Sequence, residues 1–178
     1  MALTRVGLVL LLSLAACTTN TSQLPKVAAR ESITVTSLAF QDGGRIPAAF
    51  TCDGQEAHPP LEWSGGPPAE EFVLFMVDKD ASEFVHWVVY GIPGTVTALQ
   101  AGAVPPFLKE GLNSFGKSSY GGPCPPRGDE AHHYVFTVYS LRLAKGAGLQ
   151  PGASLDQVVA AVRCCVQAVG SLSGTYGG

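Results

Sequence analysis

Four polar side chains adjoin apolar runs of the 178-residue chain, in positions where they could bind an anion. His86 lies inside one apolar run, Asp78 directly follows another, and His132 and Tyr134 stand two residues apart at the start of a third. Imidazole N–H and tyrosine O–H groups donate hydrogen bonds to anion oxygens, and a carboxylate can fix the tautomer of an imidazole. The Gly- and Pro-rich loop 121–128 adds a stiff backbone that a ligand can approach closely. Together these features predict a small anion site, with separate structural roles for the same residues as the alternative.

The stretch 111–118 matches the nucleotide-binding pattern G-x-x-x-x-G-K-[ST], but the residues around it do not suit that function. The motif binds phosphate only where a strand leads into it and a helix begins at its lysine. Three prolines within 119–126 exclude such a helix, because proline removes a backbone donor and clashes with the preceding turn. We therefore expect no nucleotide site. A G-x-S-x-G nucleophile elbow is also absent from the sequence, so no motif indicates a hydrolase with a serine nucleophile.

Apolar periodicity predicts a mainly β domain with one helix near its C-terminal end. The predicted strands are Ser32–Phe40, Phe72–Val77, Phe84–Tyr90 and Tyr134–Leu141. The last three are short continuous apolar runs, which are typical of central strands buried on both faces. A helix is predicted after the candidate N-cap Ser154, with apolar residues at helical spacing from Leu155 to Val166. Gly and Pro together supply 34 of 178 residues, which favours strands and structured turns over a helical bundle.

The overall composition is that of a single folded domain. Hydrophobic residues make up 46% of the chain and charged residues only 14%, which excludes a disordered protein. Eleven Lys and Arg stand against fourteen Asp and Glu, giving a net charge of −3 with no basic tract. We therefore expect no nucleic-acid partner, because nucleic-acid binding needs clustered cations to neutralise the phosphates.

The first residues have the features of an export signal. Arg5 precedes the apolar run 6–14, and small residues follow that run. The run is too short to span a membrane, which takes about 20 helical residues. The sequence LAAC at residues 14–17 also resembles a bacterial lipobox, in which the cysteine is lipidated and becomes the new N-terminus. Plain secretion with cleavage nearby is the alternative.

These features divide the chain into three parts. We expect residues 1–16 to be a lipoprotein signal peptide and Cys17 to carry the lipid. Residues 17–31 are polar and lack periodicity, which is typical of a flexible tether. Residues 32–178 then form the domain. The predicted location is a membrane of the bacterial cell envelope, reached by export.

Lipidation of Cys17 would leave four thiols, Cys52, Cys124, Cys164 and Cys165. Export to an oxidising compartment favours a disulfide, and four cysteines allow three pairings. The adjacent Cys164 and Cys165 are poorly placed to pair with each other, because disulfide geometry prefers Cα atoms about 5.5 Å apart. A zinc site is the competing interpretation, but the sequence holds no Cys-x-x-Cys pair, so we predict no metal.

Several segments resemble, in order and spacing, the signatures of the phosphatidylethanolamine-binding protein family. The match is closest to the bacterial and archaeal branch often labelled Raf kinase inhibitor-like. The matching segments are 51–63 (TCDGQEAHPPLEW), 78–82 (DKDAS) with 86–89 (HWVV), 120–128 (YGGPCPPRG), and 132–136 (HHYVF) with 174–176 (GTY). In the family's D-P-D-A-P segment, Lys79 and Ser82 replace both prolines here. The likeness runs from about Phe40 to the last residues of the sequence.

The resemblance implies a β-sandwich with a large central sheet, a smaller flanking sheet and a C-terminal helix. It also implies a pocket at one end that binds phosphate, acetate or a phospholipid head group. Carried over residue by residue, that ligand site would use Asp78, Asp80, His86, Cys124, Pro126, His132 and Tyr134. The two imidazoles would be its main donors, and the backbone of residues 124–126 would form its rim.

The sequence thus predicts a lipid-anchored binding module with a small anion pocket, in a regulatory or scavenging role. We expect it to bind a small anion or a phosphorylated head group, to use no cofactor and not to be an enzyme. One alternative is inhibition of an exported peptidase or another enzyme through surface loops, as some members of the resembled family do. A last alternative is hydrolysis, with Asp78 and His86 as orienter and base.

Overall fold

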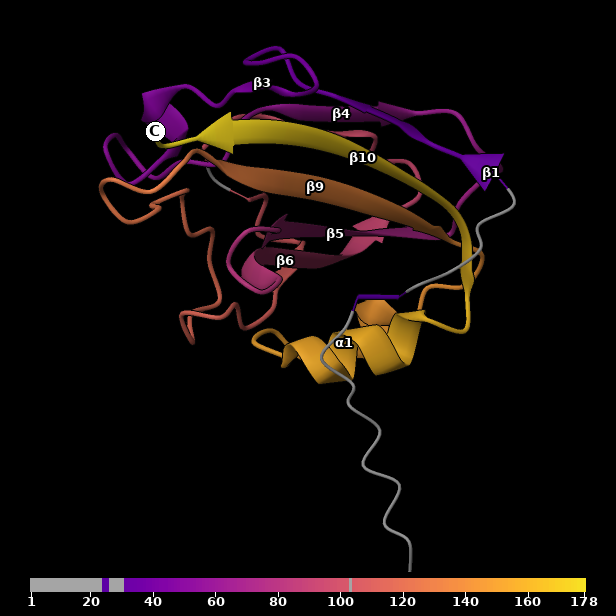
Figure 1. Cartoon of the computed structure of the whole chain (residues 1–178). Helices are drawn as coiled ribbons and strands as arrows, with labels where there is room; N and C mark the ends of the chain where they lie inside the picture. The colour runs from indigo at the N-terminus through magenta and orange to yellow at the C-terminus, as the bar shows by residue number, and fades with distance from the viewer. Residues whose placement is uncertain (1–23, 26–30, 103) are drawn as a thin grey trace, which may run out of the picture.

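A computed structural model describes residues 24–25, 31–102 and 104–178. Figure 1 shows a large sheet with a smaller sheet over one face and the helix α1 against the other. The strands are β1 (Glu31–Ser32), β2 (Thr34–Thr36), β3 (Gly44–Arg45), β4 (Leu61–Ser64), β5 (Glu71–Asp78), β6 (Phe84–Pro93), β7 (Ala98–Leu99), β8 (Lys109–Glu110), β9 (His132–Leu141) and β10 (Val166–Tyr176). The helices are α1 (Leu155–Val162) and the short 3-10 turns η1 (Ala48–Phe50) and η2 (Gly146–Gly148).

The large sheet is mixed, and its strands do not follow the order of the chain. In the described part of the chain its order is β1-β10-β9-β5-β6-β8, with β3 also paired to β10. The pairs among β10, β9, β5 and β6 are antiparallel, whereas β10 runs parallel to both β1 and β3. The small sheet has the order β2-β4-β7. The strand β10, late in the sequence, therefore lies inside the large sheet.

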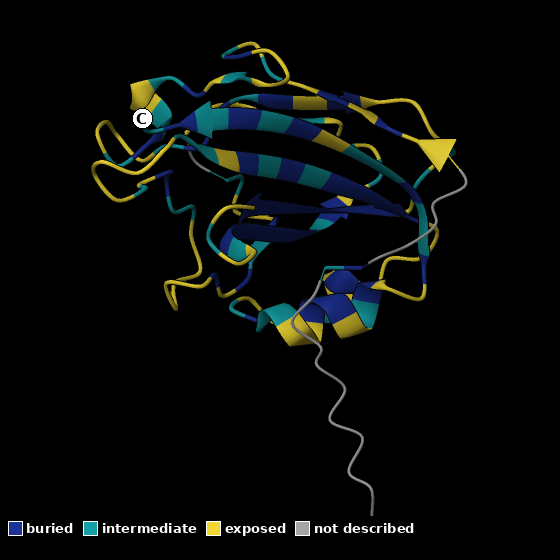
Figure 2. Ribbon diagram, viewed as in Figure 1, coloured by how far each residue is buried: buried dark blue, intermediate teal, exposed yellow. Residues whose placement is uncertain are grey.

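Strand β5 is buried along its whole length, and Figure 2 shows β5 and β6 almost uniformly dark blue. Because successive side chains of a strand point to opposite faces, β5 contributes to two cores. Leu74 packs with Trp63 of the small sheet in one core, and Phe75 packs with Val159 of α1 in the other. The prediction of a central strand buried on both faces is confirmed for β5. Full burial of each large apolar side chain contributes about 1.5–3 kcal/mol.

The predicted strand Ser32–Phe40 is only partly correct, because the chain changes sheets within it. β1 pairs with β10 in the large sheet, and β2 pairs with β4 in the small sheet. Between them, the buried Ile33 donates its backbone N–H to Val169. Residues 37–40 form no strand. The other three predicted strands lie within β5, β6 and β9 and are confirmed.

The predicted helix begins where expected but ends early. Ser154 is the N-cap, and its side chain and that of Gln157 form a reciprocal capping box, which typically contributes about 1 kcal/mol. The helix stops at Val162, so Val166, which we expected on the helix, instead begins β10. β10 was not among the predicted strands.

Two disulfides select one of the three possible pairings. Cys52 bonds to Cys124, with Cα atoms 5.5 Å apart, and Cys164 bonds to Cys165. The expectation that the adjacent cysteines would not pair is therefore wrong. Their Cα atoms are 3.8 Å apart, below the usual separation, and the two residues lie in the turn that follows α1.

The predicted signal peptide 1–16, Cys17 and most of the predicted tether lie outside the described residues. Within the tether, Leu24 packs against the core on the helix side of the large sheet, and Pro25 is buried. These two residues of the tether thus contact the domain. In the described part of the chain, no helix has the length and apolar character needed to cross a membrane.

Candidate functional site

The candidate site lies where three neighbouring strands of the large sheet meet at one end. Asp78 of β5 is in register with Phe84 of β6 on one side and with Tyr134 of β9 on the other. Side chains in register on adjacent strands share a face of the sheet. His132, two residues before Tyr134, projects from the same face, as predicted, and its ring stacks 6.4 Å from the ring of Tyr134.

A β-bulge brings His86 to this face. Met76 pairs with Trp87, whereas the next residue of β5 pairs with Val85, so His86 is the extra residue of β6. Trp87 belongs to the core between the sheets and Val85 to the core beneath the helix. The bulge turns the imidazole of His86 toward Tyr134, with ring centroids 5.2 Å apart and ring planes at 89°.

Asp78 fixes the imidazole of His132. Oδ2 of Asp78 accepts a hydrogen bond from Nδ1 of His132 at 2.7 Å. Oδ1 accepts the backbone N–H groups of Asp80 and Ala81 at 2.9 and 3.2 Å, so the carboxylate is held by the turn after β5. The hydrogen bond to Asp78 raises the pKa of His132. Its other ring nitrogen, Nε2, is not engaged by Asp78.

His86 is fixed by a backbone carbonyl instead of a carboxylate. Its Nδ1 donates to the carbonyl of Gly121 at 2.8 Å, because a carbonyl can only accept. The side chain is buried, and this burial lowers the pKa of His86. A neutral His86 with its proton on Nδ1 leaves Nε2 as a hydrogen-bond acceptor.

The hydroxyl of Tyr134 is buried between these groups. Tyr134 is 0% exposed, and its hydroxyl makes no hydrogen bond of full geometry with a described residue. Burial, then the charge of Asp78 and a hydrogen bond to Asp78, raise the pKa of Tyr134, whereas a hydrogen bond with the backbone of Cys124 acts to lower it. These contacts fall short of full hydrogen-bond geometry, so a polar ligand could complete the hydrogen bonding of the hydroxyl.

Two phenylalanines enclose the outer side of His86. The rings of Phe84 and Phe115 each lie 5.3 Å from its imidazole and 4.8 Å from each other. Buried Asn113 holds the loop that carries Phe115. Its Nδ2 donates to the carbonyls of His86 and Ser119, and its Oδ1 accepts the backbone N–H groups of Phe115 and Lys117. The stretch matching the nucleotide-binding pattern is therefore a loop that supports the candidate site.

In a comparison with known protein families, residues 36–177 match the family model described as phosphatidylethanolamine-binding protein. The chain belongs to the phosphatidylethanolamine-binding protein family. A UPF0098 protein of Aquifex aeolicus is 40% identical over 149 residues, which are 80% of this chain and 86% of that protein. LppC, a proposed lipoprotein of Mycobacterium tuberculosis, is 39% identical over 152 residues, 84% of this chain and 75% of LppC. The crystal structure of YbcL from Escherichia coli, described as a member of the mammalian family, matches with a TM-score of 0.75 and 30% identity over 82% of this chain and 98% of YbcL.

The phosphatidylethanolamine-binding protein resemblance and the fold that it implied are thus confirmed. The seven ligand residues that the resemblance implied lie in three different places in the structure. Four of them converge at one end of the sheet, namely Asp78, His86, His132 and Tyr134. We call these four residues the anion site. Asp80 lies outside it, where its carboxylate accepts the backbone N–H of His133 at 2.6 Å and contacts the His133 imidazole.

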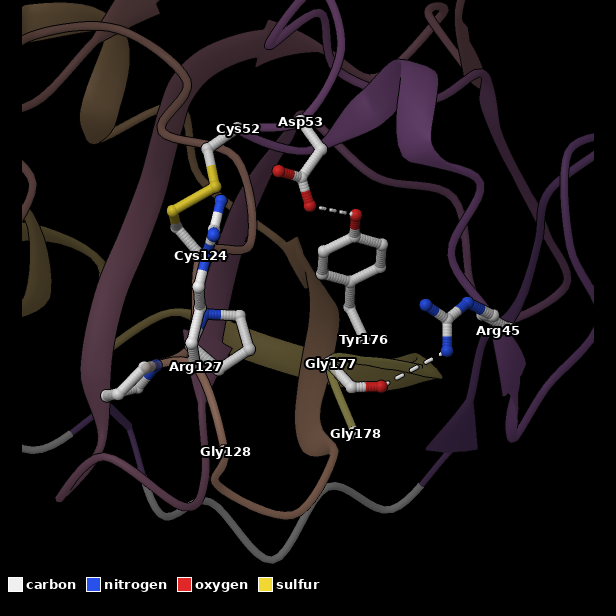
Figure 3. Close-up of a pocket in the computed structure, with 11 residues that line it drawn as sticks. Arg45, Cys52, Asp53, Cys124, Arg127, Gly128, Tyr176, Gly177 and Gly178 are labelled. Carbon is white, nitrogen blue, oxygen red and sulfur yellow. Dashed lines mark hydrogen bonds between the residues drawn. A yellow bond between two sulfur atoms is a disulfide. The ribbon is translucent and has the colours of Figure 1, made fainter.

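The other two implied residues, Cys124 and Pro126, line a cavity of about 420 Å³, and the backbone of Cys124 also contacts the hydroxyl of Tyr134. Figure 3 shows this cavity between the disulfide-bonded loop and Tyr176. It is lined by Arg45, Cys52, Asp53, Cys124, Pro125, Pro126, Arg127, Gly128, Tyr176, Gly177 and Gly178. Sequence reasoning missed both arginines, because neither adjoins an apolar run or forms a basic tract.

The Asp78–His86 pair of the last, hydrolytic alternative does not form. Asp78 hydrogen-bonds to His132, and His86 is bonded through Nδ1 to Gly121. The nearest cysteine, Cys124, is in a disulfide and offers no thiol. Among the described residues, no group of three or more His, Cys, Asp or Glu side chains could hold a metal ion.

Proposed function

We propose that this member of the phosphatidylethanolamine-binding protein family binds a small oxyanion of the phosphate class at the anion site. The observation that carries the proposal is the convergence of the imidazoles of His86 and His132 with the buried hydroxyl of Tyr134, which makes no hydrogen bond of full geometry with a described residue. A ligand oxygen would accept a hydrogen bond from the Tyr134 hydroxyl and complete its hydrogen bonding.

The protonation states of the imidazoles favour phosphate. Nδ1 of each ring is already engaged, by Gly121 for His86 and by Asp78 for His132, so each ring presents Nε2. A neutral Nε2 accepts a hydrogen bond, and a protonated Nε2 donates one. Monohydrogen phosphate and singly protonated phosphate monoesters carry both acceptor oxygens and one O–H donor. Such a ligand can satisfy a neutral His86, a protonated His132 and the Tyr134 hydroxyl together.

We propose binding without turnover at this site. The oriented imidazole of His132 resembles that of a catalytic dyad, but the cysteine beside the site is held in a disulfide and offers no thiol nucleophile.

Phosphate titration followed by histidine NMR tests the proposal. We expect the imidazole signals of His86 and His132 to shift at millimolar phosphate, and Tyr134→Phe to weaken binding about tenfold, the effect of one lost hydrogen bond of about 1.4 kcal/mol. Tyr139→Phe is the matched control, since Tyr139 lies on the same strand and belongs to the core on the helix side. Unshifted imidazoles, or equal affinity in Tyr134→Phe, would refute the site.

Titration with three ligands in the same experiment distinguishes free phosphate from a phospholipid head group as the ligand. Inorganic phosphate, phosphoethanolamine and glycerophosphoethanolamine share the phosphorus centre, but only the first two carry an ionisable P–O–H group. Tightest binding of phosphoethanolamine indicates a head-group monoester as the ligand. Preference for inorganic phosphate indicates a free-phosphate binder, and preference for the diester contradicts the role assigned to the imidazole acceptors.

We further propose that lipidated Cys17 tethers the domain to a membrane of the cell envelope. The LAAC sequence that ends at Cys17 and the similarity to the proposed lipoprotein LppC support this location. Expression of the full chain in a bacterial host should place it in the membrane fraction, and Cys17→Ser should release it from that fraction. Retention of Cys17→Ser in the membrane would contradict the lipid anchor.

A further inference from the structure

The 420 Å³ cavity beyond the anion site has the size of a small-molecule site. Its walls come from segments far apart in the chain, namely β3, the residues after η1, the loop 124–128 and the end of β10. The disulfide between Cys52 and Cys124 joins two of these walls. Such a covalent link holds the cavity in one shape before a ligand arrives, which lowers the entropic cost of binding.

Arg45 is held in a fixed orientation on one wall. Its Nη1 donates to the carbonyl of Gly177 at 3.1 Å, and its guanidinium lies 5.1 Å over the ring of Tyr176. That ring is itself fixed, because its hydroxyl donates to Oδ2 of Asp53 at 2.5 Å. Arg45 has five N–H donors, and the contact with Gly177 uses one of them. The remaining donors form a planar fork that fits a carboxylate.

Arg127 supplies a second guanidinium from the disulfide-bonded loop. Figure 3 shows Arg127 and Arg45 on either side of Tyr176. Arg127 is exposed and forms no ion pair with a described acidic side chain. Asp53 is the acidic side chain among the lining residues, and it already accepts the hydroxyl of Tyr176. The side chains around the cavity therefore carry two guanidinium groups against one engaged carboxylate.

We infer that this cavity is a second recognition site, beside the anion site, for a small organic dicarboxylate. Its two lining guanidinium groups can each bind one of two carboxylates joined by a short carbon spacer. Each planar carboxylate can accept two parallel N–H donors from an arginine. The spacer would lie between the arginines and against the apolar surface of Pro125 and Pro126. A monocarboxylate can engage one arginine at a time, so it should bind more weakly.

Calorimetric titration with acetate, malonate, succinate and glutarate tests this inference on the domain with its disulfides intact. We expect the best dicarboxylate to bind at least tenfold more tightly than acetate. Arg127→Gln and Arg45→Gln should each reduce that advantage to about that of a monocarboxylate. Arg163→Gln is the matched control, because Arg163 is an exposed arginine at the C-cap of α1 and does not line the cavity.

The Arg127 variant keeps the test decisive if Arg45→Gln disturbs folding, since Arg127 is exposed on a loop. Equal affinity for acetate and all dicarboxylates, or unchanged dicarboxylate affinity in Arg127→Gln, overturns the inference. Dicarboxylate-induced shifts at the imidazoles of His86 and His132, with none at the arginine Nε–H signals, also overturn it. Phosphate binding at the anion site is measured separately, so either site can fail while the other stands.

Discussion

Nδ1 of His132 lies 2.7 Å from Oδ2 of Asp78, whose second oxygen accepts the backbone N–H groups that begin the turn after β5. One carboxylate therefore shapes the turn and orients the imidazole. The side chain of Asp78 is only 4% exposed, so solvent does little to weaken this contact. The local fold and the protonation of the anion site are thus coupled through Asp78.

Replacement of Asp78 by Asn should lower the pKa of His132. The hydrogen bond to the Asp78 carboxylate is the main cause of the raised pKa, and a neutral amide stabilises the imidazolium far less. Histidine NMR titration of wild type and Asp78→Asn measures the change. Asp80→Asn is the control, because Asp80 acts on His132 only through weaker long-range attraction. An unchanged His132 pKa in Asp78→Asn would show that the contact does not govern the imidazole.

Phosphate affinity should fall as the pH rises through the pKa of His132. This pKa lies above the ordinary value of 6.5, and the folded state therefore holds the His132 proton more tightly than the unfolded state does. The His132–Asp78 pair therefore stabilises the folded state fully when the pH is below the pKa of His132 in the unfolded state. This stabilisation is lost as the pH rises through the pKa of His132 in the folded state. Phosphate titrations and unfolding curves between about pH 6 and pH 9 measure both effects. A phosphate affinity that rises over this range would contradict the proposed donor.

Sulfate should bind more weakly than phosphate at neutral pH, by about tenfold or more. Burial keeps His86 neutral, and its Nε2 then needs a hydrogen-bond donor that sulfate does not have. A buried acceptor left unpaired costs about 1–3 kcal/mol. Competition between the two anions, followed at the His86 signals, measures this preference. Equal binding of the two anions would mean that Nε2 of His86 does not accept from the ligand.

Removal of the Cys52–Cys124 disulfide should destabilise the domain by about 4 kcal/mol, because it frees a loop with a sequence separation of 72. Replacement of both cysteines by serine, followed by denaturant unfolding, measures the loss. The paired control replaces Cys164 and Cys165 by serine. That bond closes a ring between adjacent residues and constrains the unfolded chain little, so we expect a loss of about 1 kcal/mol. Equal losses in the two double variants would contradict this account.

Replacement of Asn113 by Ala should cost about 2–4 kcal/mol of folding free energy. Its buried side chain makes four hydrogen bonds to backbone groups, and each group left unpaired carries a desolvation cost. The aromatic signals of Phe115 should also broaden or shift as its loop loosens. Lys117→Ala is the control on the same loop, because its side chain is exposed. A stability loss no larger than that of the control would exclude Asn113 as the support of this loop.

The sequence was sufficient to predict the strands and side chains that obey simple periodicity. β5 reads as a continuous apolar run, and the positions of His132 and Tyr134 two residues apart placed them on one face. His86 reaches the same face only through a bulge, and no residue type marks that bulge in the sequence. His86 entered the predicted site as a polar residue inside an apolar run, and the family resemblance assigned it to the same site.

Strand β10 escaped prediction for a steric reason. Gly170 and Gly174 interrupt its apolar pattern, and both positions lack room for a side chain. A Cβ at Gly174 would approach Ile46 to within 2.6 Å, and a Cβ at Gly170 would collide with the backbone of Ile33. Close packing thus requires glycine at both positions, and glycines within a strand make it hard to recognise from the sequence. The arginines of the second cavity were missed because segments distant in the chain bring them together.

The hydrogen-bonding partners of β10 in the sheet are β1, β3 and β9, and all three precede it in the chain. The central sheet therefore cannot close until residues 166–176 have been synthesised. Before that moment β9 presents an unpaired edge, which is the kind of surface that aggregates or recruits chaperones.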